Sequence, residues 1–566
     1  MMTGSGADKE ALLGSALVAP VAAGQYVDVL ESPAGVKLIA RHVASLLKPA
    51  ESPTNDEIDE PDAVAVGLAA FDAFLQVNVT GPILDRVTTV EQLFATAAQQ
   101  LQTESSNAKG IVSIRKLALA SLDVDGVSPY PYIPHIELFA LARHIFCHEP
   151  SLKTQTFPVP SGDESSLVTN LTLSWARLRI HAWHYRLLTQ PNLGPGSTFI
   201  KSSQWSDVPT LASLVVDLMG ETSKQVLDQE LWSQVQNFST QDKVQLLLEL
   251  TNYHIMLGRD DKARDTLNRA VREHAFVYAL SGALGKRTKF QENNTSQLVV
   301  LAKSAHDPAR NGDEHARPDA LDLNDDTLLE KIAFSKDSNG QSEDKGKVEL
   351  PAALADLGPD DQPQLAPLDQ IILLAEATLK DSFSPVDSLT SEEVLPYAVR
   401  VIDDKPTNWQ IYTQALLVRS RIESHRSRTV ERAVLQMQAV VDQVIVDAAA
   451  APEKQEEAAE MKDEDPEDES AESSIPFISV TGPDHGEPAP ASAPAAVDKP
   501  VSFFRAPKPS DSAPAHVRLQ YIHALASPPR WHLESELAYA WANVGSLVSA
   551  LEIFKRLRLW PRWRSV

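Results

Sequence analysis

One stretch near the end of the chain, from Leu537 to Phe554, restricts the fold more than any other. It places small residues where two helices would cross, large residues where they would interlock, and a glycine where the chain would turn. The positions that carry this pattern are Leu537, Ala538, Trp541, Gly545, Ala550, Phe554 and Leu557. Two helices can approach closely at small residues and can be joined tightly at glycine. The stretch therefore predicts a helical hairpin.

The offsets of these residues match the tetratricopeptide repeat, a hairpin that stacks on other hairpins because it cannot bury its apolar face alone. An ordinary amphipathic hairpin with glycine at its corner is the alternative interpretation. A weaker copy lies in residues 247–275, where Thr251 replaces the small residue and His254 the aromatic one. The matching positions there are Leu250, Gly258, Ala263, Leu267 and Ala270. We therefore expect an all-α fold of the α-solenoid class, with residues 515–560 as the first hairpin of an array.

The remaining sequence predicts helical regions separated by two polar inserts. Residues 1–300 repeat apolar residues at three- and four-residue spacing, which predicts an N-terminal all-helical domain with a surface loop from Phe157. Residues 303–365 are polar, charged and poor in aromatic residues, which predicts a disordered insert. Helices resume in residues 366–448. Residues 449–512 predict a disordered linker, first acidic and then rich in proline and alanine.

The net charge restricts the kind of partner that the chain can bind. The sequence carries 77 acidic and 51 basic residues, a formal net charge of -26, which repels nucleic acids and anionic membranes. It holds no run of 18 consecutive apolar residues, so we expect no insertion into a membrane. Cys147 is the only cysteine, which excludes an intramolecular disulfide and suits a reducing cytoplasm. We expect other proteins as partners, with the acidic linker as either a solubilising spacer or a tail for a basic partner.

Motifs that would indicate catalysis or a cofactor are incomplete. The segment Gly282–Thr288 places glycine before lysine, but Leu280 stands where a phosphate-binding loop needs glycine, and Arg287 where it needs serine or threonine. We interpret the segment as a basic corner between a helix and a loop. His181 and His184 are three residues apart on a predicted helix, without a third metal ligand nearby. We predict no catalytic, cofactor-binding or metal-binding residue, no small-molecule substrate and no enzymatic activity. A catalyst within the N-terminal helical domain is the alternative.

Five arginines form a concentrated basic element at the corner between two predicted helices. They are Arg419, Arg421, Arg426, Arg428 and Arg432. Arginine side chains bind phosphate groups and acidic peptides, so this arginine corner is a candidate partner-binding site, with RNA as one alternative partner. Glu423 and Glu431 are interleaved at spacings that suit ion pairs on a helix surface. A solvated face that pairs with itself is the simpler interpretation.

Four segments carry a family resemblance. They are YALSGALGKRTKFQ from Tyr278, PLDQIILL from Pro367, NWQIYTQALLVRSRIESHRSRTVERAVLQMQAVVD from Asn408, and RLQYIHALASPPRWHLESELAYAW from Arg518. Together they resemble the tetratricopeptide-repeat-domain-27 family, whose fungal members are called essential-for-maintenance-of-the-cell-wall proteins. The resemblance implies a non-enzymatic repeat protein of the cytoplasm, with the nucleus as a second compartment. It also implies binding to other proteins, with a role in cell-wall maintenance in fungi and in chaperone-linked assembly elsewhere.

The resemblance leads to expectations about the end of the chain. The family continues into further repeats after Trp560, so we expect a truncated member whose last apolar residues are uncovered. These residues are Leu551, Phe554, Leu557, Leu559 and Trp560. We expect the final hairpin to rest on the helices of residues 408–446, or to be poorly ordered, and its exposed face to promote self-association.

A clamp for a chaperone tail is not expected. Such clamps in other repeat proteins present lysine and asparagine from the first helices of successive repeats. The corresponding inward positions here are Leu248 and Asn252 in the weaker hairpin, and Ser535 and Tyr539 in the final one.

Overall fold

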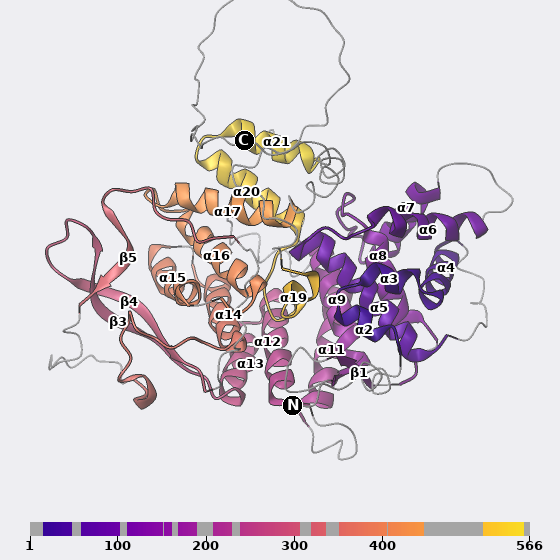
Figure 1. The fold of residues 1–566 in the computed structure, drawn as a ribbon, viewed down its shortest axis with the longest axis horizontal. Helices are drawn as coiled ribbons and strands as arrows, with labels where there is room; N and C mark the ends of the chain where they lie inside the picture. Colours follow the sequence, from indigo (N-terminus) through magenta and orange to yellow (C-terminus); the bar gives the residue numbers. More distant parts are fainter. Residues whose placement is uncertain are drawn as a thin grey trace, which may run out of the picture.

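The computed structural model describes residues 15–47, 58–101, 110–150, 152–154, 156–160, 168–189, 208–228, 238–305, 318–335, 350–385, 387–404, 406–445 and 513–559. The predicted linker at 449–512 lies outside these ranges, as do the residues from Trp560 onward and part of the predicted insert at 303–365. Helices predominate in the described residues (Figure 1).

The N-terminal helices form a bundle around α5 (Glu60–Leu75), which continues into the π-helical turn η1 (Gln76–Thr80). The other helices of the bundle are α2 (Val18–Ala22), α3 (Tyr26–Glu31), α4 (Pro33–Leu47), α6 (Val87–Leu101), α7 (Gly110–Ser121), α8 (Ile136–His148), α9 (Leu173–Thr189) and α11 (Pro209–Val226). The stretch Glu60–Thr80 is long and apolar enough to cross a membrane, but 83% of its apolar window is buried inside the fold. Its apolar character is therefore that of a core helix.

From α12 onward, consecutive helices pair as hairpins that stack on one another. Within the described residues these hairpins are α12 (Thr240–Met256) with α13 (Asp260–Glu273), α14 (Pro367–Phe383) with α15 (Ser388–Asp403), α16 (Trp409–Glu423) with α17 (Val430–Ile445), and α20 (Arg530–Asn543) with α21 (Leu547–Arg556). Each hairpin contacts the next, since α13 packs on α14, α15 on α16 and α17 on α20 (Figure 1). The result is an α-solenoid of tetratricopeptide type, in which α20–α21 follows three earlier hairpins and is not the first.

The final hairpin is covered more fully than the sequence suggests. It rests on α17, within the helices of residues 408–446. The expectation that Phe554 and Leu557 are uncovered is wrong, because they are 1% and 7% exposed. Tyr130 of the N-terminal bundle covers this end, and its hydroxyl donates to the Leu557 carbonyl. Leu551 and Leu559 are half-buried. The exposed apolar residues lie instead around the turn, at Val544, Leu547 and Val548.

Two antiparallel sheets interrupt the helices, so the prediction that residues 1–300 are all helical is wrong at these places. β1 (Thr156–Pro160) pairs with β2 (Val168–Thr172) where a loop from Phe157 is predicted. A second sheet has the order β4-β3-β5, with β3 (Val277–Thr288), β4 (Thr295–Lys303) and β5 (Leu328–Phe334). β5 and the 3-10 turn η5 (Ala352–Leu354) lie inside the insert predicted to be disordered. The predicted insert is therefore ordered in part, and Gly282–Thr288 belongs to a strand rather than to a helix–loop corner.

The strands have no clear alternating pattern in the sequence, and one of their pairings, that of β3 with β5, joins segments that are not neighbours along the chain. β3 is half-exposed along most of its length, so neither of its faces is continuously apolar. β5 pairs with β3 at Gly285, where an added Cβ would lie 2.8 Å from Cγ2 of Ile332. Glycine thus permits a close approach that becomes apparent only when both strands are in place.

Substitution of Gly545, at the turn of the final hairpin, tests how much its backbone conformation contributes to stability. Its φ of +90° strains any other residue, although an added Cβ would meet nothing within 4 Å. We expect Gly545→Ala to lower the free energy of unfolding by about 1 kcal/mol, measured by urea denaturation. Gly220 within α11 is the matched control, because its added Cβ also meets open space and its φ is not positive. Gly220→Ala should raise stability by about 0.5–1 kcal/mol, and equal effects of both changes would contradict the backbone argument.

Candidate functional site

The arginine corner mostly makes contacts within the chain. Arg419 is 6% exposed and donates to Oε1 of Gln436 on α17 (2.9 Å). Three others form ion pairs, namely Arg421 with Glu536 of α20 (3.0 Å), Arg426 with Glu392 of α15 (3.2 Å), and Arg432 with Glu423 of α16 and Glu330 of β5 (2.5 Å each). Arg428 is exposed and donates to the Thr327 hydroxyl (3.0 Å). The corner therefore links two hairpins to the last hairpin and to the sheet.

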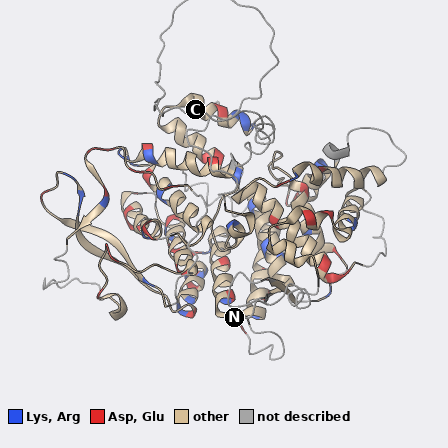
Figure 2. Ribbon diagram, in the orientation of Figure 1, with Lys and Arg blue, Asp and Glu red and all other residues tan. Residues whose placement is uncertain are grey.

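The electrostatics of the corner match this internal role. Burial raises the pKa of Glu536, but the neighbouring Arg421 and His532 outweigh burial and hold this pKa at about 2. Burial lowers the pKa of Arg419, against the attraction of Glu423. Elsewhere charges of both signs are interspersed along the described helices rather than gathered on one face (Figure 2).

Arg432 and Arg428 allow a matched comparison of a buried and an exposed arginine of the same corner. The side chains of Arg432 and Glu423 are 8% and 4% exposed, so Arg432→Gln leaves a buried carboxylate without its ion pair. We expect that change to lower the free energy of unfolding by about 3 kcal/mol. Arg428→Gln, at the exposed position, should cost less than about 1 kcal/mol. Urea denaturation measures both, and loss of a protein partner with Arg428→Gln at unchanged stability would favour a binding role instead.

The residues of the repeat pattern meet where α20 crosses α21. Leu537, Ala538 and Ala550 are fully buried, as close helix crossing requires. Trp541 is half-buried, and its indole N–H donates to Oε1 of Gln438 on α17 (3.0 Å). This hydrogen bond joins the last hairpin to the preceding one.

The weaker hairpin has the same geometry despite its two departures from the pattern. Ala263, Leu267 and Ala270 are buried at the crossing of α12 and α13. Thr251 stands at the small position, and its hydroxyl donates to the Leu247 carbonyl (2.8 Å). Because this hydroxyl is satisfied within its own helix, threonine is tolerated in the interior.

Three of the four inward positions are buried, and the fourth, Tyr539, is half-buried. Leu248 is fully buried, and the Asn252 amide donates to the Ala524 carbonyl (2.6 Å). Ser535 is buried, and the Tyr539 ring packs edge-on against Phe554 with their centroids 5.0 Å apart. Other parts of the chain therefore contact these positions within the described residues.

The two histidines of α9 make structural contacts. Nε2 of His184 lies 2.8 Å from the Leu122 carbonyl oxygen, and Nε2 of His181 lies 3.4 Å from Sγ of Cys147. In the part of the chain that the structure describes, no group of three or more His, Cys, Asp or Glu side chains could hold a metal ion. Burial lowers the pKa of His181 to about 4 and that of His184 to about 3, and the nearby Arg143 lowers both further.

Acidification should therefore destabilise the N-terminal bundle. An unfolded histidine takes up a proton at about pH 6.5, whereas these two remain neutral in the folded chain until far lower pH. Their contribution to stability is present above pH 6.5 and is lost as the pH falls. Between pH 7 and pH 5 each should remove about 2 kcal/mol from the free energy of unfolding. His184→Gln keeps a donor for the Leu122 carbonyl and should reduce the pH dependence, so an unchanged slope in urea denaturation would contradict the assignment.

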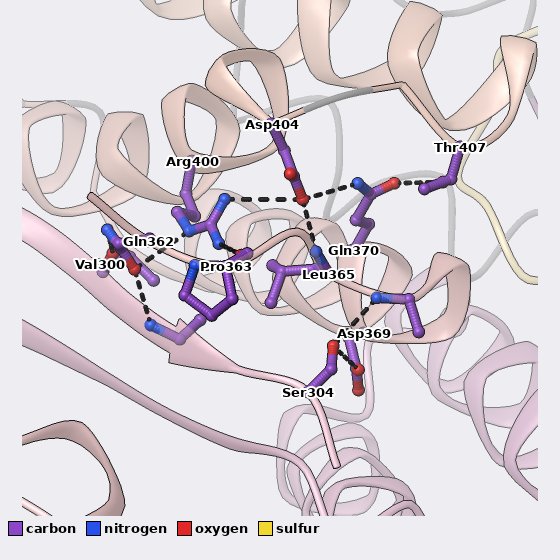
Figure 3. Close-up of polar contacts among 12 residues, drawn as sticks. Val300, Ser304, Gln362, Pro363, Leu365, Asp369, Gln370, Arg400, Asp404 and Thr407 are labelled. Carbon is purple, nitrogen blue, oxygen red and sulfur yellow. Dashed lines mark hydrogen bonds and ion pairs between the residues drawn. The ribbon is translucent and has the colours of Figure 1, made fainter. Parts of the chain in front are cut away.

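A polar cluster that sequence analysis missed joins the second sheet to the α14–α15 hairpin (Figure 3). Gln362 takes the place of a strand residue, because its Oε1 accepts from the Ala302 amide (3.0 Å) and its Nε2 donates to the Val300 carbonyl (3.1 Å). Arg400 donates to the Pro363 carbonyl (2.6 Å) and pairs with Asp404 (3.6 Å). Only the four-residue spacing of Arg400 and Asp404 is visible in the sequence.

The carboxylates of this cluster hold the chain where it enters α14. Asp404 accepts from the Leu365 amide (2.8 Å) and from Nε2 of Gln370 (3.0 Å). Burial raises the pKa of Asp369 to about 7, although a hydrogen bond from Ser304 opposes this shift. Asp369 is fully buried, so this perturbed carboxyl group is not accessible to a substrate.

A groove in the described part of the N-terminal bundle is relevant to the alternative of a hidden catalyst. It measures about 220 Å³, lies between α4 and α6, and is lined by aliphatic, threonine and glutamine side chains such as Ile39, Leu93 and Gln92. None of the lining residues is ionisable, so this groove offers no acid–base pair.

Comparisons with known proteins identify relatives of this chain. No protein-family profile and no solved structure matches it. A TPR repeat-containing protein of Schizosaccharomyces pombe is 31% identical over 90% of this chain and 51% of its own length. The Essential for maintenance of the cell wall protein 1 of Saccharomyces cerevisiae is 25% identical over 88% of this chain and 50% of its own length. A Tetratricopeptide repeat protein 27 homolog of Dictyostelium discoideum is 28% identical over 53% of this chain and 26% of its own length.

The chain thus spans about half the length of the first two relatives. The similarity extends along nearly the whole chain, including the stacked hairpins and the N-terminal bundle. On these relatives and on its stacked helical hairpins, the chain belongs to the tetratricopeptide repeat protein 27 family.

Proposed function

We propose that this chain is a tetratricopeptide-type scaffold that binds other proteins and is not an enzyme. The stack of hairpins from α12–α13 to α20–α21 supports the proposal, because such stacks present long continuous surfaces to partners. Relatives named for tetratricopeptide repeats support it as well. Most of the perturbed side chains described above, among them Asp369 and His184, are buried inside the fold, which favours binding over chemistry.

The finer role that we propose is assembly of other protein complexes in association with chaperone machinery, which in a fungus serves maintenance of the cell wall. The name of the Saccharomyces cerevisiae relative supports the cell-wall role. The formal net charge of -26 favours protein partners over nucleic acids or anionic membranes. We place the protein in the cytoplasm, with the nucleus as a second compartment, and fluorescence microscopy of a tagged chain tests this placement.

Two substitutions on α21 test whether the binding of protein partners depends on the repeat array. Ala550 is fully buried at the helix crossing, so Ala550→Arg should separate α21 from α20. Glu552 is exposed on the same helix, and Glu552→Arg is the matched control. We expect a tagged chain to recover a defined set of proteins from its own cells. Ala550→Arg should reduce that recovery about tenfold, as loss of a central binding element does, and Glu552→Arg should leave it unchanged.

The same purification can overturn the proposal. Recovery of RNA in place of proteins, retained in a salt-sensitive way, would favour binding through the arginine corner. Specific thermal stabilisation of the purified chain by a nucleotide or metal ion, with no protein recovered, would favour a catalyst.

A further inference from the structure

Residues 513–529 form a segment, here named the docking segment, that lies between the N-terminal bundle and the stacked hairpins. It contains the short helix α19 (Ala515–Leu519), which lies between the two halves of the molecule in Figure 1. The docking segment leads directly into α20 at Arg530. In the sequence it is separated from α17 by residues 446–512, which lie outside the described ranges.

Side-chain amides of the body hold the main chain of the docking segment. Nδ2 of Asn408, at the start of α16, donates to the Val517 carbonyl (2.9 Å). Nδ2 of Asn252, in α12, donates to the Ala524 carbonyl (2.6 Å). Both amides are at least 96% buried, since Asn408 is 2% and Asn252 is 4% exposed. Two separate hairpins thus bind the same peptide by its backbone, a contact that fixes its position and direction.

Arg518 anchors the middle of the docking segment. Its side chain is fully buried and lies over the Trp409 ring, with Cζ 4.0 Å from the ring centroid. Nη1 donates to the Thr80 carbonyl at the end of η1 (2.9 Å), and Nε donates to the Ala513 carbonyl (2.8 Å). One arginine therefore contacts both the N-terminal bundle and the α16–α17 hairpin.

The apolar residues of the docking segment complete both hydrophobic cores. Ala515, Leu519 and Ile522 belong to the core that the N-terminal bundle shares with the last hairpin. Ala524 and Leu525 belong to the core of the middle hairpins. Burial of apolar surface on both sides of a segment gives it a large share of the association free energy.

We infer that the body of this chain, residues 15–445, contains a peptide-binding groove whose ligand is its own docking segment. The docking segment then attaches to the body through these contacts, while the final hairpin packs on α17. This inference concerns the assembly of the chain itself and does not depend on the proposed scaffold function.

Cutting the connection tests the inference on the full chain. A recognition sequence for a site-specific protease is inserted among the proline and alanine residues of 487–499, and the folded protein is cleaved. We expect the two pieces to elute together in size-exclusion chromatography and to separate only in denaturant. Separation of the pieces in native buffer would overturn the inference.

Substitutions in the groove and in its ligand show which contacts hold the cleaved pieces together. Arg518→Gln removes the guanidinium that contacts Thr80 and Trp409, and should weaken the retention of the cleaved C-terminal piece about tenfold or more. Lys555→Gln, on the exposed side of α21 in the same piece, is the control and should retain it fully.

A second variant covers the case in which Arg518→Gln prevents folding. Asn252→Ala removes one amide contact and places a strong helix former in α12, so the body should still fold. It should also weaken retention of the cleaved piece. The assignment of the groove would be overturned if Asn252→Ala retained the cleaved piece as fully as the unsubstituted protein does. Where Arg518→Gln folds, it would have to show the same full retention.

Discussion

The contacts of the Arg518 guanidinium fix how the N-terminal bundle, the stacked hairpins and the docking segment are placed relative to one another. Burying a charged group is costly unless it is hydrogen-bonded and its charge is stabilised. Here two main-chain carbonyls accept from it, and the Trp409 ring stabilises its charge from one face. These partners come from η1, from α16 and from the docking segment, so the cost is offset only when all three are assembled. The contact therefore favours one arrangement of the two halves over others.

Buried amides extend the same principle to an extended segment and to the free edge of a strand. Backbone groups removed from water must find partners, and a segment that crosses between helices lacks a ladder of its own. Gln436 of α17 supplies such partners to an extended segment, accepting from the Leu321 amide (2.8 Å) and donating to the Asp319 carbonyl (2.9 Å). Gln362 does the same for β4. Buried side-chain amides thus provide hydrogen-bond partners for backbone groups of the sheet and of the docking segment.

This use of polar side chains engages many charged groups of the described residues inside the chain. Most of the arginine corner and the carboxylates around Arg400 are engaged with one another and with the backbone. Side chains held in this way fix the angle between hairpins, which decides the shape of the surface offered to a partner. A scaffold requires such fixed surfaces, whereas an enzyme would need some of these groups to be accessible.

Local sequence determined the helical hairpins, because the signals for them lie within about thirty residues. Ala538, Gly545 and Ala550 stand at spacings that a single hairpin imposes, and the same holds for Gly258 and Ala263. The family resemblance likewise rests on residues that are local to each hairpin. The choice between a solvated and a binding arginine corner remained open. Spacing along the helix identifies Glu423 as a partner of the arginines, but it does not identify Glu330, Glu392 or Glu536, which are distant in the sequence.

Only the tertiary structure decided the strands, the covering of the last hairpin and the docking segment. β3 and β5 have weak patterns of their own, and Gly285 acquires its meaning only when Ile332 lies against it. Tyr130 covers the final hairpin from a position more than four hundred residues earlier. Arg518 and Thr80 are similarly remote in the chain. Spacing in the sequence encodes contacts within one or two turns of a helix, but contacts between distant segments depend on how all the helices pack, and that packing has no local signature.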